Sequence, residues 1–149
     1  MIRIVRPADT PAEVYDYWHQ RWVEYLNQHY KERFVQAGIV NMSFTEKCPD
    51  CPNGSGGFHY AFASDGTLGF IDEDGDAIIE YDSYDSAYRL LGDESCNTTE
   101  LFDKGGIRFT RNIEHFVKLA EILPLMREAF YVAIVDAENR FNIEMPKYV

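Results

Sequence analysis

The stretch IIEYDSYDSAYRLLGDESCNTTELFDKGGIRFTRNIEHFVKLAEIL, residues 78–123, decides the predicted fold of this chain. Its apolar residues switch between the alternation of a half-buried strand and the wider spacing of an amphipathic helix. In order, the pattern predicts a strand over 77–81, short helices over 84–91 and 97–104, a strand over 107–110 and a helix over 113–123. Asp82 or Ser83 caps the first helix, Gly92 ends it, and Asn112 caps the last helix.

Three further strands are predicted upstream, over 40–45, 58–63 and 68–70, where apolar and polar residues alternate. Asp65-Gly66 marks a tight turn, and the acidic run DEDGD at 72–76 predicts a solvated turn. Consecutive strands joined by short turns favour an antiparallel meander. With the strand at 107–110, we expect an antiparallel sheet of about five strands.

A long helix is predicted over 11–37, with Thr10 as its cap. Aromatic side chains recur along it at helical spacing, so they share one face. These residues are Tyr15, Trp18, Trp22, Tyr25 and His29. The face packs on the core, lines a ligand pocket, or forms a homodimer seam through Trp18 and Trp22. His19, next to Trp18, is expected to be exposed.

Helical spacing returns over 125–137, after Pro124. The predicted order along the chain is therefore one long helix, then a sheet, then further helices. This order predicts a single α+β domain over residues 1–149, with helices packed on one face of an antiparallel sheet.

The stretch at 78–123 resembles the C-terminal half of the sterol carrier protein type-two domain. In that family a strand leads into a short helix that ends in glycine, and a second short helix leads to a glycine at a strand start. A strand of alternating basic and apolar residues and a helix begun by asparagine complete the run, as at 107–110 and Asn112 here. Two features depart from the family: Gly105-Gly106 looks like a one-residue insertion, and Arg111 stands where the family usually has glycine.

The resemblance implies an apolar tunnel between the sheet and the C-terminal helices, in which the family binds sterols, fatty acyl chains or other lipids without chemistry. We therefore expect a carrier of a lipid or other apolar small molecule. Large apolar side chains would form the wall, although cores use the same residue types. The predicted ligand-binding residues are Trp18, Trp22, Phe70, Phe109, Phe116, Leu119, Leu123, Met126 and Phe130.

The composition argues against several partners. The net charge is −11, and no basic face is available to neutralise nucleic-acid phosphates or an anionic membrane. The longest apolar run, at 129–135, is too short to span a bilayer, so we expect no stable membrane insertion. Without a signal-peptide pattern, the sequence predicts a cytoplasmic protein.

The motif CPDC places Cys48 and Cys51 in a CxxC spacing, followed by a glycine-rich run. The pair would be half of a zinc knuckle, which Cys96 and His59 could complete if the loops converge. A thioredoxin-like redox pair is disfavoured, because no helix can begin in the glycine-rich run. A hairpin loop with two ordinary thiols, or a reversible disulfide across it, is the favoured interpretation.

Catalytic motifs are scarce. The sequence holds neither GxGxxG nor GxxxxGK[ST], so the cradles for dinucleotide and nucleotide phosphates are missing. We expect a binding protein that needs no cofactor rather than an enzyme. Two alternatives stay open: a small enzyme with Tyr60, His59 or His115 at the mouth of the same pocket, and a zinc-stabilised interaction module built on the CxxC loop.

Overall fold

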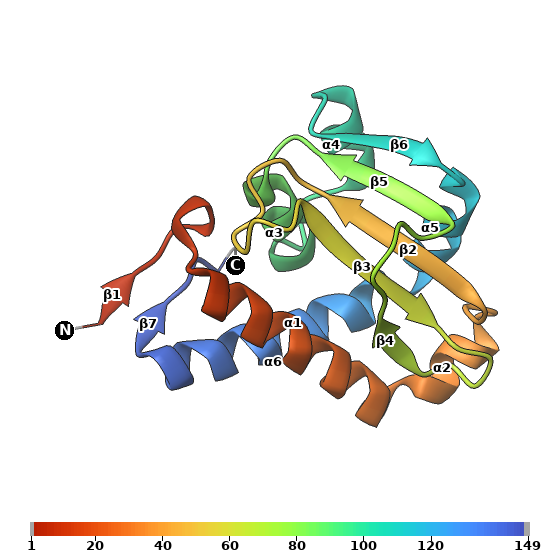
Figure 1. Ribbon diagram of the computed structural model, residues 1–149, viewed down its shortest axis with the longest axis horizontal. Coiled ribbons are helices and arrows are strands. Elements are labelled where there is room, and N and C mark those ends of the chain that lie inside the picture. The colour runs from red at the N-terminus through yellow and green to blue at the C-terminus, as the bar shows by residue number, and fades with distance from the viewer. Residues whose placement is uncertain (1, 148–149) are drawn as a thin grey trace.

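The computed structural model describes residues 2–147 and has an α+β fold (Figure 1). Its helices are α1 (Ala12–His29), α2 (Lys31–Gln36), α3 (Tyr84–Gly92), α4 (Thr98–Asp103), α5 (Ile113–Leu119) and α6 (Leu123–Phe141), with short 3-10 turns η1 (Pro7–Asp9) and η2 (Ala120–Ile122). The main sheet contains β2 (Met42–Lys47), β3 (Gly57–Phe62), β4 (Leu68–Phe70), β5 (Ala77–Tyr81) and β6 (Ile107–Arg111). Two end strands, β1 (Arg3–Ile4) and β7 (Ile143–Glu144), form a separate parallel pair. The predicted class is confirmed.

The main sheet is mixed rather than purely antiparallel, with the strand order β4-β3-β2-β5-β6. β2 pairs antiparallel with β3 but parallel with β5. The predicted meander is therefore correct for β2, β3 and β4 and wrong for β5, which the chain carries to the other side of β2. An alternating pattern identifies a strand but does not specify its neighbour, so the pattern could not reveal this crossing.

The segment 71–76, which connects β4 to β5, crosses one face of the sheet (Figure 1). The backbone N–H of Gly75 donates to the Thr45 hydroxyl at 2.7 Å, and that of Asp76 donates to the Ser43 hydroxyl at 2.8 Å. We call the face that carries Ser43 and Thr45 the outer face. The acidic run predicted as a solvated turn is thus a crossover held against β2.

Gly75 approaches β2 so closely that a side chain has no room there. A Cβ at this position would lie 2.4 Å from the backbone nitrogen of Phe44 and 2.6 Å from the carbonyl carbon of Ser43. We expect Gly75→Ala to lower the free energy of unfolding by about 3 kcal/mol, because backbone atoms must shift. Chemical denaturation measures this loss.

Gly69→Ala in β4 is the matched control, since a Cβ there meets no atom within 4 Å. This variant should change the unfolding free energy by less than about 1 kcal/mol. Equal stability of the two variants would contradict the close approach of the crossover to β2.

The opposite, inner face of the sheet forms the floor of the hydrophobic core. Phe44 and Tyr60 are buried on it. Trp22 of α1 packs edge-on against Tyr60, and Phe116 of α5 packs against Phe44. α6 lies alongside α1 (Figure 1), and the Trp22 indole donates to the carbonyl of Met126 at 3.1 Å. The core therefore lies between the inner face and the helices.

The predicted long helix over 11–37 is two helices. Tyr30 breaks it with φ −132° and ψ 8°, and its hydroxyl donates to Glu128 on α6. The predicted Thr10 cap is also wrong, because the Thr10 hydroxyl donates to the carbonyl of Pro7 at 2.8 Å. The sequence pattern reveals neither the contact of Tyr30 with α6 nor that of Thr10 with η1.

The C-terminal half agrees better with the prediction. Ser83 caps α3 by accepting from the backbone N–H of Ser86, and α6 contains the predicted helical segment 125–137. The helix expected over 113–123 ends earlier, and η2 joins it to α6. Asn112 begins it with φ 49° but makes no side-chain cap, since its amide donates to the carbonyl of Asp76.

Candidate functional site

A cavity of about 320 Å³ lies between the inner face of the sheet and the helices. We call it the main cavity. Its wall residues come from α1, the strands β2, β5 and β6, and the segments from α3 to α6. They are Trp22, Glu46, Ile79, Tyr81, Leu90, Leu91, Thr98, Phe109, Ile113, Phe116, Val117, Leu119, Ala120, Leu123 and Met126.

The main cavity opens beside α5. Ile113 and Val117 line it, yet they expose 50% and 65% of their surface. Apolar side chains that face both a cavity and the surface mark an entrance. A molecule entering here would pass α5 before it reached the floor made by β5 and β6.

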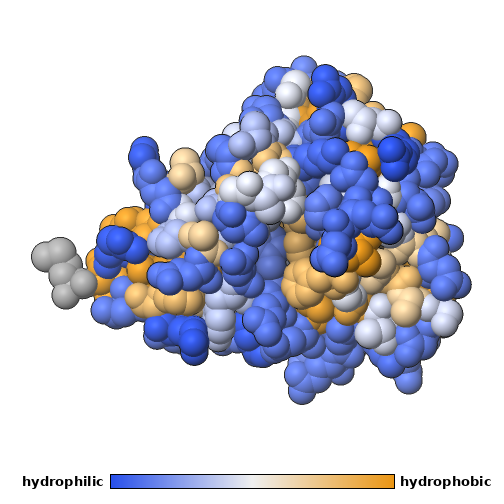
Figure 2. Space-filling view, viewed as in Figure 1, coloured by the Kyte–Doolittle hydropathy of each residue, from blue (hydrophilic) through white to orange (hydrophobic). Residues whose placement is uncertain are grey.

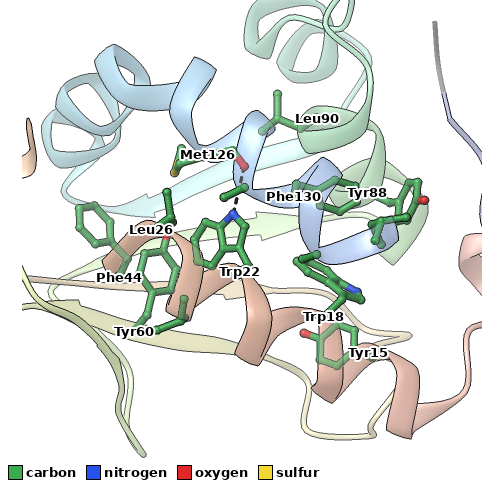
Figure 3. Close-up of a cluster of buried hydrophobic side chains, with 14 of the residues drawn as sticks. Tyr15, Trp18, Trp22, Leu26, Phe44, Tyr60, Tyr88, Leu90, Met126 and Phe130 are labelled. Atoms are coloured by element: carbon green, nitrogen blue, oxygen red, sulfur yellow. Dashed lines mark hydrogen bonds between the residues drawn. The ribbon is translucent and has the colours of Figure 1, made fainter. Parts of the chain in front are cut away.

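A smaller cavity of about 40 Å³ adjoins the first and is here called the side cavity. Four wall residues are common to both cavities: Trp22, Glu46, Tyr81 and Leu91. Figure 3 shows Trp18 and Trp22 extending from α1 toward Met126 and Phe130 on α6. The four shared residues form the boundary between the two cavities.

Glu46 is the polar centre of both cavities. The Tyr60 hydroxyl donates to its Oε2 at 2.6 Å, and the Tyr81 hydroxyl donates to its Oε1 at 2.8 Å. Burial raises the pKa of Glu46, and the two hydrogen bonds oppose that rise. The carboxylate therefore lies in an apolar wall with phenols as its hydrogen-bond donors.

Sequence reasoning missed Glu46 because the predicted strand ended at residue 45, whereas β2 continues to Lys47. The sequence nevertheless contained a signal for Glu46. Residues two apart in a strand share a face, and Glu46 follows Met42 and Phe44 in that register. An acidic residue in an apolar series was the available clue.

Six of the predicted ligand-binding residues line the main cavity: Trp22, Phe109, Phe116, Leu119, Leu123 and Met126. Trp18 lines the side cavity. Phe130 packs edge-on against Trp18 and lines a separate hollow beside α3. That any of them binds a ligand stays a prediction.

Phe70 is the predicted wall residue that the structure places elsewhere. It lies on the edge strand β4, exposes 53% of its surface and packs edge-on against Phe58. Figure 2 shows apolar side chains interrupting the mostly hydrophilic surface in this region of the molecule. The alternating pattern puts Phe70 on the inner side, but its position at the end of an edge strand leaves it exposed.

The aromatic face of α1 is buried at Tyr15, Trp18 and Trp22, half-buried at Tyr25 and exposed at His29. Trp18 and Trp22 each expose 2% of their surface, and the Trp18 indole donates to the Tyr84 hydroxyl at 3.0 Å. A dimer seam through these two residues is therefore wrong, and a homodimer through another surface stays a prediction.

His19 is buried, contrary to the expectation that it is exposed. It exposes 7% of its surface, stacks on Trp18 and packs against Tyr15 and Phe58. Its Nδ1 donates to the carbonyl of Tyr15 at 2.7 Å. Burial lowers the pKa of His19 to about 3, although that hydrogen bond opposes the shift.

The CxxC loop holds two buried free thiols. The backbone N–H of Cys48 donates to the carbonyl of Gly56, which closes the loop. The pKa of Cys51 is lowered mainly by a hydrogen bond from Cys48, and a hydrogen bond from the Tyr15 hydroxyl lowers it further. Burial of the Cys51 thiol acts in the opposite direction. The same contact between the two cysteines raises the pKa of Cys48.

Within residues 2–147, no three His, Cys, Asp or Glu side chains gather as a metal site. The His59 ring bonds to the Thr45 hydroxyl at 2.8 Å on the outer face, and Cys96 lies between α3 and α4. Zinc at Cys48 and Cys51 stays a prediction, which elemental analysis of the purified chain would test.

The three residues of the enzyme alternative do not share a site. Tyr60 faces inward to Glu46, and its neighbour His59 faces outward to Thr45. His115 lies on α5 near Phe44, with ring centroids 6.3 Å apart. A catalytic group made of His59, His115 and Tyr60 therefore has no support from the geometry.

No helix in the described part of the chain is long and apolar enough to cross a membrane.

Comparison with solved structures identifies the fold. A solution structure of the sterol carrier protein domain 2 of Helicoverpa armigera superposes with a TM-score of 0.51 at 18% identity, covering 78% of this chain and 89% of that one. A conserved hypothetical protein of Thermus thermophilus, described as possibly a sterol carrier protein, gives 0.55 at 13% identity, covering 78% and 85%. This chain has the sterol carrier protein 2 fold. A UbiJ-SCP2 ubiquinone synthesis protein shares this fold with a TM-score of 0.55 at 14% identity, covering 76% and 96%.

No family model and no curated protein sequence matches the chain. The similarity to the sterol carrier protein 2 fold is therefore shown by the structure alone. Sequence identities of 18%, 13% and 14% are too low to transfer a function to this chain. In this fold the main cavity lies between the sheet and the C-terminal helices, where the sequence resemblance implied a tunnel.

Proposed function

We propose that this protein binds and carries a lipid or another apolar small molecule in the main cavity. The observation that supports this function is a space of about 320 Å³ whose wall is apolar apart from Glu46, Thr98 and the Tyr81 hydroxyl. Ligand sites in proteins begin at about 300 Å³ and are lined mainly by apolar side chains with few polar groups. Several solved structures of the same fold carry sterol carrier names, which supports the same class of ligand.

The volume limits the ligand. At about 30 Å³ for each water-sized group, the main cavity of about 320 Å³ accepts about ten methylene groups. Each buried methylene contributes about 0.8 kcal/mol, and the costs of association offset part of this sum. Ten methylene groups contribute about 8 kcal/mol before those costs, so a ten-carbon chain is a suitable probe, and we expect it to bind more weakly than the micromolar affinity that a net 8 kcal/mol would give.

Titration of delipidated protein with 1-decanol tests the proposal. We expect saturation at about one ligand per chain, because the main cavity holds about ten methylene groups. Trp22 lines both cavities, so its fluorescence should change with occupancy, and calorimetry gives the stoichiometry. The proposal fails if neither this alcohol nor its amine and carboxylate analogues bind.

Mass spectrometry of molecules that co-purify with the native chain would identify the physiological ligand.

The cytoplasmic location predicted from the sequence stays a prediction.

A further inference from the structure

Glu46 is the charged side chain in the wall of the main cavity, and it also lines the side cavity. Tyr60 and Tyr81 each donate one hydrogen bond to it, at 2.6 and 2.8 Å. A carboxylate with two oxygens offers about four acceptor sites. Since Glu46 is partly accessible and lines the cavities, its remaining acceptor capacity is available to a bound molecule.

Within residues 2–147, Glu46 takes part in no ion pair with Lys, Arg or His. The titratable groups that act on it or are affected by it are Tyr60, Tyr81 and Cys48, none of them cationic at neutral pH. A half-buried carboxylate in an apolar wall, without a cation beside it, is costly, and its two phenol partners compensate only in part. A ligand that donates a hydrogen bond would reduce this cost.

The same site disfavours a ligand carboxylate. No Lys or Arg lines either cavity, so an acid that reached Glu46 would place two carboxylates together in an apolar space. An alcohol or a protonated amine of equal length donates a hydrogen bond to Glu46 instead. Because hydrogen bonds to a charged group contribute about 1.5 to 3 kcal/mol, the difference in affinity should reach about tenfold or more.

We propose that Glu46 selects apolar ligands whose inner end donates a hydrogen bond, as an alcohol or an amine does, over carboxylates of the same chain length. This inference rests on the proposed function and adds the chemical class of the ligand. It concerns the end of the molecule that reaches the boundary between the two cavities. The outer end lies near Ile113 and Val117 at the entrance.

The test compares three probes that differ only in the polar end: 1-decanol, decylamine and decanoate. We measure their affinities near neutral pH for the wild-type chain and for Glu46→Gln. The wild type should bind the alcohol or the amine about tenfold more tightly than the acid. Glu46→Gln should reduce this ratio toward one, because the amide carries no charge to repel a carboxylate.

Glu80→Gln is the matched control. Glu80 lies on β5 and pairs with Arg108 at 2.9 Å on the exposed side of the sheet, away from both cavities. This variant removes the same charge from the chain and should keep the wild-type ratio. If the wild type binds 1-decanol and decylamine with different affinities, the tighter probe shows whether a hydroxyl or an ammonium group is the preferred donor.

Three results separate the possible failures. If decanoate binds as tightly as the other probes, or if Glu46→Gln leaves the ratio unchanged, the role of Glu46 is overturned while the carrier function stands. If no probe binds, the carrier function fails and the inference fails with it. Circular dichroism checks that each variant folds.

Should Glu46→Gln not fold, Tyr81→Phe replaces it. This change removes the donor at 2.8 Å from Oε1 and leaves that oxygen free for the ligand. The preference for alcohol or amine over acid should then widen, and an unchanged or narrower preference overturns the inference.

Discussion

A tryptophan in place of Leu123 should weaken the binding of 1-decanol strongly and leave the fold intact. Leu123 begins α6, lines the main cavity and is only half-buried. A larger ring at this position can therefore extend into empty space without displacing its neighbours, unlike an enlarged side chain in a filled core. Because the cavity of about 320 Å³ holds about ten methylene groups, an indole that occupies part of it excludes a ten-carbon chain.

We expect the affinity of Leu123→Trp to fall more than about tenfold, a loss above 1.4 kcal/mol, measured by calorimetry. Leu125→Trp is the control, since Leu125 lies on the same helix, is also half-buried and does not line the main cavity. It should bind nearly as the wild type does. Retained binding in Leu123→Trp, with the helix content unchanged, would place the ligand outside the main cavity.

Acid should destabilise the protein through His19. Burial holds the pKa of this side chain at about 3, against the ordinary 6.5 of an exposed histidine. Between these values the unfolded chain binds a proton that the folded chain does not, so the stability is present above pH 6.5 and is lost as the pH falls toward 3. At about pH 5 the loss amounts to about 2 kcal/mol.

His19→Phe should remove this dependence, because phenylalanine keeps the aromatic contacts with Trp18 and Phe58 and does not titrate. Chemical denaturation at several pH values gives the slope for each variant. His29→Gln, which removes a histidine from the exposed end of α1, should keep the wild-type acid profile. If His19→Phe shows the same acid loss as the wild type, His19 is not the group responsible.

Local pattern was sufficient for most elements of the fold. The short helix α3, its cap at Ser83 and the helical segment 125–137 depend on contacts within a few residues, which the sequence displays directly. The parallel pairing of β5 involves residues far along the chain, such as Thr45 opposite Ile78, and Tyr30, where α1 ends, contacts the equally distant Glu128. The spacing of apolar residues does not reveal such distant partners.

The candidate site was predictable in its apolar part and not in its polar part. Apolar residues at helical spacing placed Phe116, Leu119 and Leu123 on one face, and they meet in the main cavity. Phe70 shares that pattern but lies on an edge strand, where coverage by a helix decides burial. The pairing of Glu46 with Tyr81 requires the parallel registration of β2 and β5, so no local pattern could reveal it.

The parallel pairing of β2 with β5 leads us to expect an order in which the sheet assembles. The hairpins from β2 to β4 close over short loops and can form from local contacts, whereas β5 returns to β2 only after the chain has crossed the sheet. Tyr81 reaches Glu46 through this late, non-local step. Because residues from β5, β6, α5 and α6 line the main cavity, we expect it to take shape only after these later segments have packed against β2.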